Sequence, residues 1–366
     1  MKYVISFKRV WLVLLVPFTA ILTYLGRLYP AATERLFSQG LYRIIAYCYG
    51  HIFGLLPFSA AQFMIILLPV ILVLYLFFVI MRIIKYPKTR KKGIVRLFVN
   101  IMCVISVTWF LFMMLCGLNY ARVSYAEVSG LEIRHSSAAE LVDLCEELAI
   151  QVNASSACVA RNEEGRMYPS AGNYYALARQ ARAAFQAAAE EYPVLAGFCP
   201  LPKPVLYSRL MSHVNISGIY IPFTMEANVN VDISDYAIPA IMNHEIAHFK
   251  GFMREDEANF IAYLTCKSSG SPDFVYSGDM LAFVYAANQL RSVSNTDYRR
   301  IMSGLADGAI LDLQANNAYW KQFEGPMAEF SKSVNDAYLK SNQQFDGIKS
   351  YGRMVDLLLA DYRMRH

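Results

Sequence analysis

Residues 243–264 read NHEIAHFKGFMREDEANFIAYL and place two of the chain's six histidines four residues apart, with a glutamate directly after the first. On an α-helix, residues four apart project from the same face, so His244 and His248 can bind one metal ion together. The HExxH pattern uses these two imidazoles as zinc ligands and the glutamate, here Glu245, to activate a water molecule. We therefore expect a helix that carries one Zn2+ per chain.

A catalytic zinc site usually has three protein ligands and one open position, so the two histidines need a third partner. Gly251 suits a left-handed helix stop, after which a second helical run can fold back over the first. Such a reversal brings the carboxylate of Glu255 or Glu257 to the metal. The EDEAN segment, residues 255–259, resembles the Glu-x-x-Ala-Asp segment of zinc peptidases with a glutamate third ligand. That resemblance implies Glu255 as ligand and Asn259 as the residue that orients a histidine, with Glu257 as the alternative because asparagine replaces aspartate.

The 366-residue chain is more apolar than an ordinary soluble domain, with 56% hydrophobic and 17% charged residues. Three apolar segments, at about residues 10–26, 61–81 and 97–117, are long enough to cross a bilayer. The connection at residues 82–96 holds seven lysines and arginines and is expected to be a cytoplasmic loop. The aromatic segment at residues 38–59 either lies in the membrane interface or dips partway into the bilayer.

These segments divide the chain into a membrane region, residues 1–118, and an extracytoplasmic domain, residues 119–366. The N-terminus is also basic (Lys2, Lys8 and Arg9), so three crossings of the cytoplasmic membrane deliver the later domain to the outer face. The net charge of +5 is concentrated beside the apolar segments, which argues against a nucleic-acid-binding face.

The later domain reads as mainly helical, with a different texture at residues 203–234. There, Val, Ile and Tyr alternate in part and are broken by Gly218 and Pro222, which indicates two or three strands. The sequence therefore predicts three transmembrane helices followed by a helical α+β domain with a small sheet. In an oxidising compartment its cysteines could pair in disulfides, although the spacing indicates no particular pairing: Cys145, Cys158, Cys199 and Cys266.

Four stretches carry a family resemblance: GLNYAR (117–122), SGIYIPFTMEANVN (217–230), NHEIAHFKGFMREDEANFIAYL (243–264) and DGIKSYGRMVDLLL (346–359). They are similar to bacterial membrane proteins of the peptidase MA type, catalogued as domain of unknown function 3810. The resemblance covers most of the later domain and implies a zincin-like metallopeptidase fold with a glutamate third ligand. It implies no particular substrate.

The strand segment before the motif helix supplies further candidate residues. We expect residues 218–232 to form an edge strand above the metal, to which an extended peptide can add by main-chain hydrogen bonds. Glu226, Asn228 and Asn230 are candidate substrate contacts on it, although polar side chains on a strand are often simply solvated. A transition-state donor has three candidates, although side chains of these types are more often ordinary packed or interface residues: His213, Tyr220 and Tyr263.

Two functions fit these patterns. The first is a membrane-anchored zinc metallopeptidase that cleaves a peptide or protein at the outer face of the cytoplasmic membrane. The second is a catalytically silent metal-binding sensor or binding module with the same fold. The intact Glu245 favours the enzyme, because a binding module needs no general base. Charged neighbours and the distance along the chain from the apolar segments place the motif outside the bilayer. The sequence indicates no oligomeric state.

Overall fold

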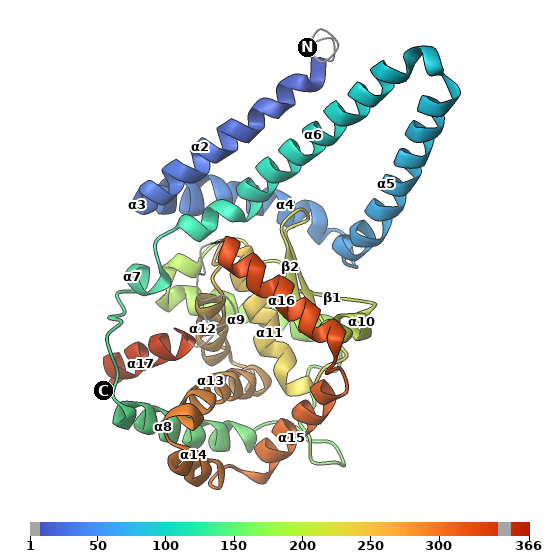
Figure 1. Ribbon diagram of the computed structural model, residues 1–366. Coiled ribbons are helices and arrows are strands. Elements are labelled where there is room, and N and C mark those ends of the chain that lie inside the picture. The colour runs from blue at the N-terminus through green and yellow to red at the C-terminus, as the bar shows by residue number, and fades with distance from the viewer. Residues whose placement is uncertain (1–7, 343–352) are drawn as a thin grey trace.

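The computed structural model describes residues 8–342 and 353–366 (Figure 1). Lys2 of the basic N-terminus lies outside the described residues, as do residues 346–352 of the DGIKSYGRMVDLLL stretch.

Three helices in the described part are long and apolar enough to cross a membrane, which confirms the three predicted apolar helices. The first combines a 3-10 turn with an α-helix, the second contains Pro69, and the third follows a short 3-10 turn. Their bounds are η1 (Lys8–Leu14) with α2 (Leu15–Leu28), α5 (Ala60–Lys85), and η3 (Pro87–Thr89) with α6 (Arg90–Leu115).

The prediction that residues 82–96 form a loop is wrong in its extent. The α5 helix continues to Lys85 and α6 begins at Arg90, so only residues 86–89 connect the two helices. Lysine and arginine are good helix formers, so the basic residues extend both helices beyond their apolar parts. The basic cluster is therefore the tip of a helical hairpin (Figure 1).

The segment between the first two apolar helices packs against the later domain. It consists of α3 (Pro30–Ala32), the π-helix η2 (Thr33–Leu41) and α4 (Tyr42–Gly54). The Tyr42 hydroxyl donates a hydrogen bond to the carbonyl of Phe249 at 3.1 Å, and Tyr42 shares a buried cluster with Leu115, Tyr220 and Phe249. The boundary drawn at residue 118 therefore cuts through a shared core.

The domain after α6 is mainly helical, as the sequence predicts. Its main core lies among α8, α9, α11, α12, α13 and α17. The α8 helix begins with a capping box, in which the side chains of Ser137 and Glu140 each accept a hydrogen bond from the other residue's backbone N–H. The helices are η4 (Gly117–Ala121), α7 (Tyr125–Ser129), α8 (Ala138–Ser156), α9 (Tyr174–Glu191), η5 (Pro193–Leu195), α10 (Ser208–His213), η6 (Asp235–Ala237), α11 (Ile238–Phe249), α12 (Glu255–Lys267), α13 (Pro272–Val293), α14 (Asn295–Met302), α15 (Asp307–Lys321), α16 (Pro326–Ser341) and α17 (Met354–Arg365).

The predicted small sheet is present and has three strands in the order β1-β3-β2. The strands are β1 (Lys203–Pro204), β2 (Gly218–Ile221) and β3 (Glu226–Val229). The β1 strand runs parallel to β3, and β2 forms an antiparallel hairpin with β3 in which Ile219 lies opposite Asn228. The sheet packs beside α11, so the motif helix lies between it and the main helical core.

All seven cysteines are free thiols in the structure. The four cysteines of the later domain therefore form no disulfide: Cys145, Cys158, Cys199 and Cys266.

A buried ion pair joins the sheet to the start of α5. The Lys203 ammonium lies 2.6 Å from the Glu226 carboxylate and also donates to the carbonyls of Phe53 and Phe58. Glu226 in turn accepts hydrogen bonds from the first two backbone N–H groups of α5, those of Ala60 and Ala61, at 3.1 and 2.7 Å. A carboxylate at a helix N-terminus is favourable because it satisfies free N–H groups and faces the positive end of the helix dipole.

We expect Glu226→Gln to lower the free energy of unfolding by roughly 3–5 kcal/mol, because it leaves the Lys203 charge buried without its partner. Thermal unfolding of the full chain in detergent measures the loss. The matched control is Glu164→Gln, which removes an exposed ion pair with Arg166 and should cost less than about 1 kcal/mol. Equal losses for the two variants would show that the buried pair does not hold the sheet to α5.

Candidate metal centre

The metal-binding motif lies on α11, which has a proline in its first turn and ends in a tight reversal. The N–H of Phe252 donates to the carbonyl of Ala247 at 3.1 Å, and the N–H of Gly251 donates to that of His248 at 2.9 Å. This pair of bonds is the Schellman motif, which requires a left-handed residue, and Gly251 has a φ of +88°. The chain then turns into α12, whose first residue is Glu255.

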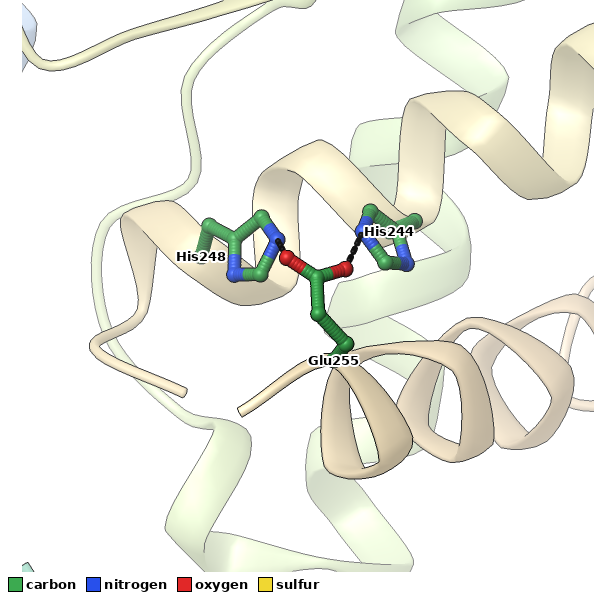
Figure 2. Close-up of side chains that lie close together, drawn as sticks. All are labelled: His244, His248 and Glu255. Carbon is green, nitrogen blue, oxygen red and sulfur yellow. Dashed lines mark ion pairs between the residues drawn. The ribbon is translucent and has the colours of Figure 1, made fainter. Parts of the chain in front are cut away.

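The reversal brings three potential ligands together (Figure 2). The Nε2 atoms of His244 and His248 lie 3.2 and 3.6 Å from the two carboxylate oxygens of Glu255. One ligand atom from each residue lies within 4.8 Å of the other two, and the imidazole rings are nearly perpendicular. Two imidazoles and a carboxylate form a donor set that suits Zn2+.

A backbone carbonyl orients the imidazole of His248. The Nδ1 atom of His248 lies 2.8 Å from the carbonyl of Phe252, so with Nδ1 protonated this hydrogen bond leaves Nε2 to act as a ligand. The Arg122 guanidinium covers the Phe252 ring at 3.9 Å and pairs with Glu34 at 2.7 Å. A salt bridge between η2 and the later domain therefore supports the loop that holds His248.

The two imidazoles differ in the direction of their pKa shifts. Burial lowers the pKa of His244, but hydrogen bonding to Glu255 and the charges of Glu255 and Glu245 outweigh burial, and the net pKa is raised. Burial lowers the pKa of His248 to about 4, so this ring is neutral near pH 7. Because histidine and carboxylate ligands must be deprotonated to bind a metal, acid favours protons over a metal at these residues.

Glu245 lies under the edge of the sheet. A side chain at Gly218 of β2 would collide with the Glu245 carboxylate, and a backbone hydrogen bond from Tyr220 also reaches this group. Within the described residues, Oε2 of Glu245 is buried and has no hydrogen-bond partner. Burial is the main cause that raises the pKa of Glu245; His244 lowers it, the nearby Glu255 raises it, and the resulting pKa is about 8. A cation held by the three ligands would favour the ionised form and lower this pKa.

The structure places Glu257 away from the two histidines. Its carboxylate is buried, pairs with Arg254 at 2.9 Å and accepts a hydrogen bond from the backbone N–H of Tyr125 at 2.8 Å. Glu255 and Glu257 lie two residues apart on a helix, which turns them about 200° from each other. Only one of them can therefore face α11, and that residue is Glu255.

The expectation that Glu226, Asn228 and Asn230 lie on an edge strand is wrong. Glu226 and Asn228 belong to β3, the middle strand, and Asn230 follows it directly. All three side chains are buried in structural hydrogen bonds: Glu226 holds α5, while Asn228 and Asn230 donate to the carbonyls of Ile219 and Ile216. Within the described sheet the strand at the edge beside Glu245 is β2.

The three candidate donors occupy different places. The hydroxyl of Tyr220 lies 3.2 Å from that of Tyr42, and its ring centre lies 6.5 Å from that of His248. His213 ends α10 and packs edge-on against Phe323. Tyr263 is buried in the main core beside Phe260. Only Tyr220 is close to a potential ligand.

Sequence reasoning missed one residue beside the site, Tyr285 on α13. Its hydroxyl accepts a hydrogen bond from the amide of Asn259 at 3.1 Å. Burial raises its pKa, and the charge of Glu255 contributes, as expected for a hydroxyl near that carboxylate. Asn259 also helps to raise the pKa of His244, so Tyr285 holds the residue that was expected to orient a histidine. No sequence signal distinguishes Tyr285 among 25 tyrosines.

Comparison with known proteins identifies one family. The family model described as "Protein of unknown function (DUF3810)" matches residues 37–359, most of the chain. The chain therefore belongs to this family. No curated protein and no solved structure matches it.

We expect the purified full-length protein to contain about one zinc per chain, measured by elemental analysis. The double change His244→Ala with His248→Ala should remove it, and Glu255→Gln should weaken its retention because a ligand charge is lost. Acidification should also release the metal, because protons compete for the ligands.

Glu257→Gln is the matched control for the third ligand, because it removes a carboxylate from the same helical turn that faces away from the histidines. It should retain the zinc. Loss of zinc from Glu257→Gln together with retention by Glu255→Gln would show that the metal-bound arrangement differs from this geometry.

Proposed function

We propose that this member of the DUF3810 family is a membrane-anchored zinc metallopeptidase that cleaves a peptide or protein at the outer face of the cytoplasmic membrane. The observation that carries the proposal is the meeting of His244, His248 and Glu255 within 4.8 Å, with Glu245 one residue along the same helix. The unpartnered, buried Oε2 of Glu245 supports it, because a group with only a structural role is normally hydrogen-bonded.

The residues divide into ligands and a proton carrier. His244, His248 and Glu255 would hold the ion, and Zn2+ bound there would supply a Lewis acid that polarises the scissile carbonyl and acidifies water. Glu245 would accept a proton from the attacking water at its unpartnered Oε2 and pass that proton to the nitrogen of the leaving amine. Burial keeps bulk water from competing for this proton.

The position of β2 supports an extended substrate. The β2 strand has only one hydrogen-bonded neighbour in the described sheet, and its Gly218 lies against Glu245. A peptide that added to this edge would pass close to the proton carrier. Glycine at this point is explained by the close approach, since any larger side chain would displace the carboxylate.

Glu245→Gln tests the enzyme against the silent module. The substitution keeps the side-chain volume and the three ligands but removes the proton acceptor, so we expect zinc to be retained and hydrolysis to fall about 10²- to 10⁴-fold. Membrane and exported proteomes from cells with either version should reveal polypeptides that accumulate uncleaved and co-purify with the variant. Full biological activity of a zinc-loaded Glu245→Gln chain would instead favour the sensor or binding module.

The proposed location requires the basic hairpin tip inside and the metal domain outside. The exposed Cys48 and Cys158 are first replaced, so that they do not react. A single cysteine then replaces either Arg90, at the hairpin tip, or Glu164, an exposed residue of the later domain, so that each reports on one side of the membrane. We expect a membrane-impermeant thiol reagent to label intact cells at Glu164→Cys and only lysed cells at Arg90→Cys. The reverse pattern would place the metal centre in the cytoplasm.

A further inference from the structure

The α16 helix presents a line of apolar side chains to solvent. Met327, Phe330 and Val334 are each more than half exposed, and Tyr338 continues the line at its C-terminal end. Spacings of three, four and four residues place these four side chains on one face of the helix. The buried contact of α16 is made instead by Leu339. The three more exposed residues of this face, Met327, Phe330 and Val334, therefore do not serve to hold α16 on the domain.

The line leads to the end of the third apolar helix. The Tyr338 ring packs edge-on against Phe112, which lies in the last turn of α6, with 6.5 Å between the ring centres. The Tyr338 hydroxyl also lies 3.4 Å from that of Tyr120, just beyond α6. Figure 1 shows the C-terminal end of α16 near the end of α6, while its N-terminal end adjoins α15 farther down the domain.

A second apolar patch lies at the start of α5. Leu206 and Leu210, in and just before α10, are 68% and 65% exposed. The backbone N–H of Leu206 donates to the side chain of Gln62, in the first turn of α5, at 3.0 Å. Arg209 of α10 covers the ring of Phe323, three residues before α16, at 5.3 Å. The patch is therefore tied both to α5 and to the beginning of α16.

We propose that these two patches form one docking surface that rests in the outer interface of the lipid bilayer. The residues of this surface are Leu206, Leu210, Met327, Phe330 and Val334. Single exposed leucines are common, but here each patch is attached to the end of a different apolar helix, so both lie where such helices leave the hydrocarbon. Amphipathic surface helices bind lipid by burying an apolar face at the boundary of headgroups and acyl chains.

Lipid is the expected occupant because Tyr338 packs against Phe112 of α6 and Leu206 is hydrogen-bonded to Gln62 of α5, so each patch adjoins the end of a helix whose apolar side chains are mostly exposed. The inference rests on the membrane placement of these helices and not on the proposed hydrolysis. Docking would hold the metal centre next to the bilayer, since Tyr220, beside His248, donates a hydrogen bond to the carbonyl of Leu115 at the end of α6. A bond to be cleaved would then reach the site close to the membrane surface.

Tryptophan reporters test the surface in the full-length protein. The three native tryptophans are replaced by phenylalanine, and then Phe330→Trp or Leu206→Trp is introduced as a single reporter. Each protein is reconstituted in phosphatidylethanolamine–phosphatidylglycerol vesicles, with or without brominated acyl chains. In the vesicles, we expect both reporters to fluoresce at a shorter wavelength than in unfolded protein without detergent. We also expect their fluorescence intensity to fall when the acyl chains are brominated. Ile150→Trp is the control, because Ile150 is equally exposed and apolar on α8, away from the apolar helices (Figure 1).

Equal, unquenched emission from Phe330→Trp and Ile150→Trp would overturn the proposal, as would quenching at only one of the two patches. A photoreactive benzophenone amino acid at Phe330 in the otherwise unchanged chain gives a second measurement. Cross-linking that adds the mass of a phospholipid supports docking on lipid. Cross-linking only to a second copy of the chain or to another protein would assign the surface to a protein partner instead.

Discussion

The reversal at Gly251 is the constraint on which the candidate metal centre depends. Glu255 can meet His244 and His248 only because α11 ends at Phe249 and α12 begins at Glu255, after a connection of five residues. Gly251 adopts a φ of +88°, and atoms of Tyr42 and Asn119 lie 3.2–3.3 Å from the point where a side chain would begin. The backbone conformation therefore strongly favours glycine, and a side chain would in addition force these neighbours to shift by a few tenths of an ångström. The same turn presents the Phe252 carbonyl to His248, so one local structure positions two of the three potential ligands.

Two buried ion pairs determine where this centre lies relative to the apolar helices. Arg122 pairs with Glu34 of η2 and covers Phe252, while Lys203 pairs with Glu226, which caps α5. Burying two charges costs desolvation free energy, so we attribute to these ion pairs the role of fixing the geometry of the groups around them. Here that geometry connects η2 to the turn that follows α11, and the start of α5 to the sheet that packs on α11. The site consequently lies at the face of the domain from which the apolar helices emerge.

Much of the architecture follows from local sequence patterns, and the predictions that failed also concern particular elements. Hydropathy located the three apolar helices, and the alternation broken by Gly218 and Pro222 located the sheet. Strand order was not predictable, because β3 becomes the middle strand only by pairing with β1, which is far from it in the sequence. A middle strand is expected to be buried and therefore apolar. Glu226 and Asn228 are polar, so the sequence of β3 did not indicate a middle strand. They are buried because Lys203 and backbone carbonyls satisfy them.

The sequence by itself determined that His244 and His248 share a helix face, that Glu245 lies beside them and that three segments are apolar enough to cross a membrane. These properties depend on helix periodicity and side-chain hydropathy, which act over one or a few turns. Only the tertiary structure decided which carboxylate meets the histidines, because both Glu255 and Glu257 follow the turn and only packing of α12 on α11 selects the face. It also decided that a motif more than 120 residues beyond α6 lies beside its end, where Tyr220 contacts both Leu115 and His248. Separation along the chain does not limit distance in space once a common core forms, and the cluster around Tyr42 and Phe249 is that core.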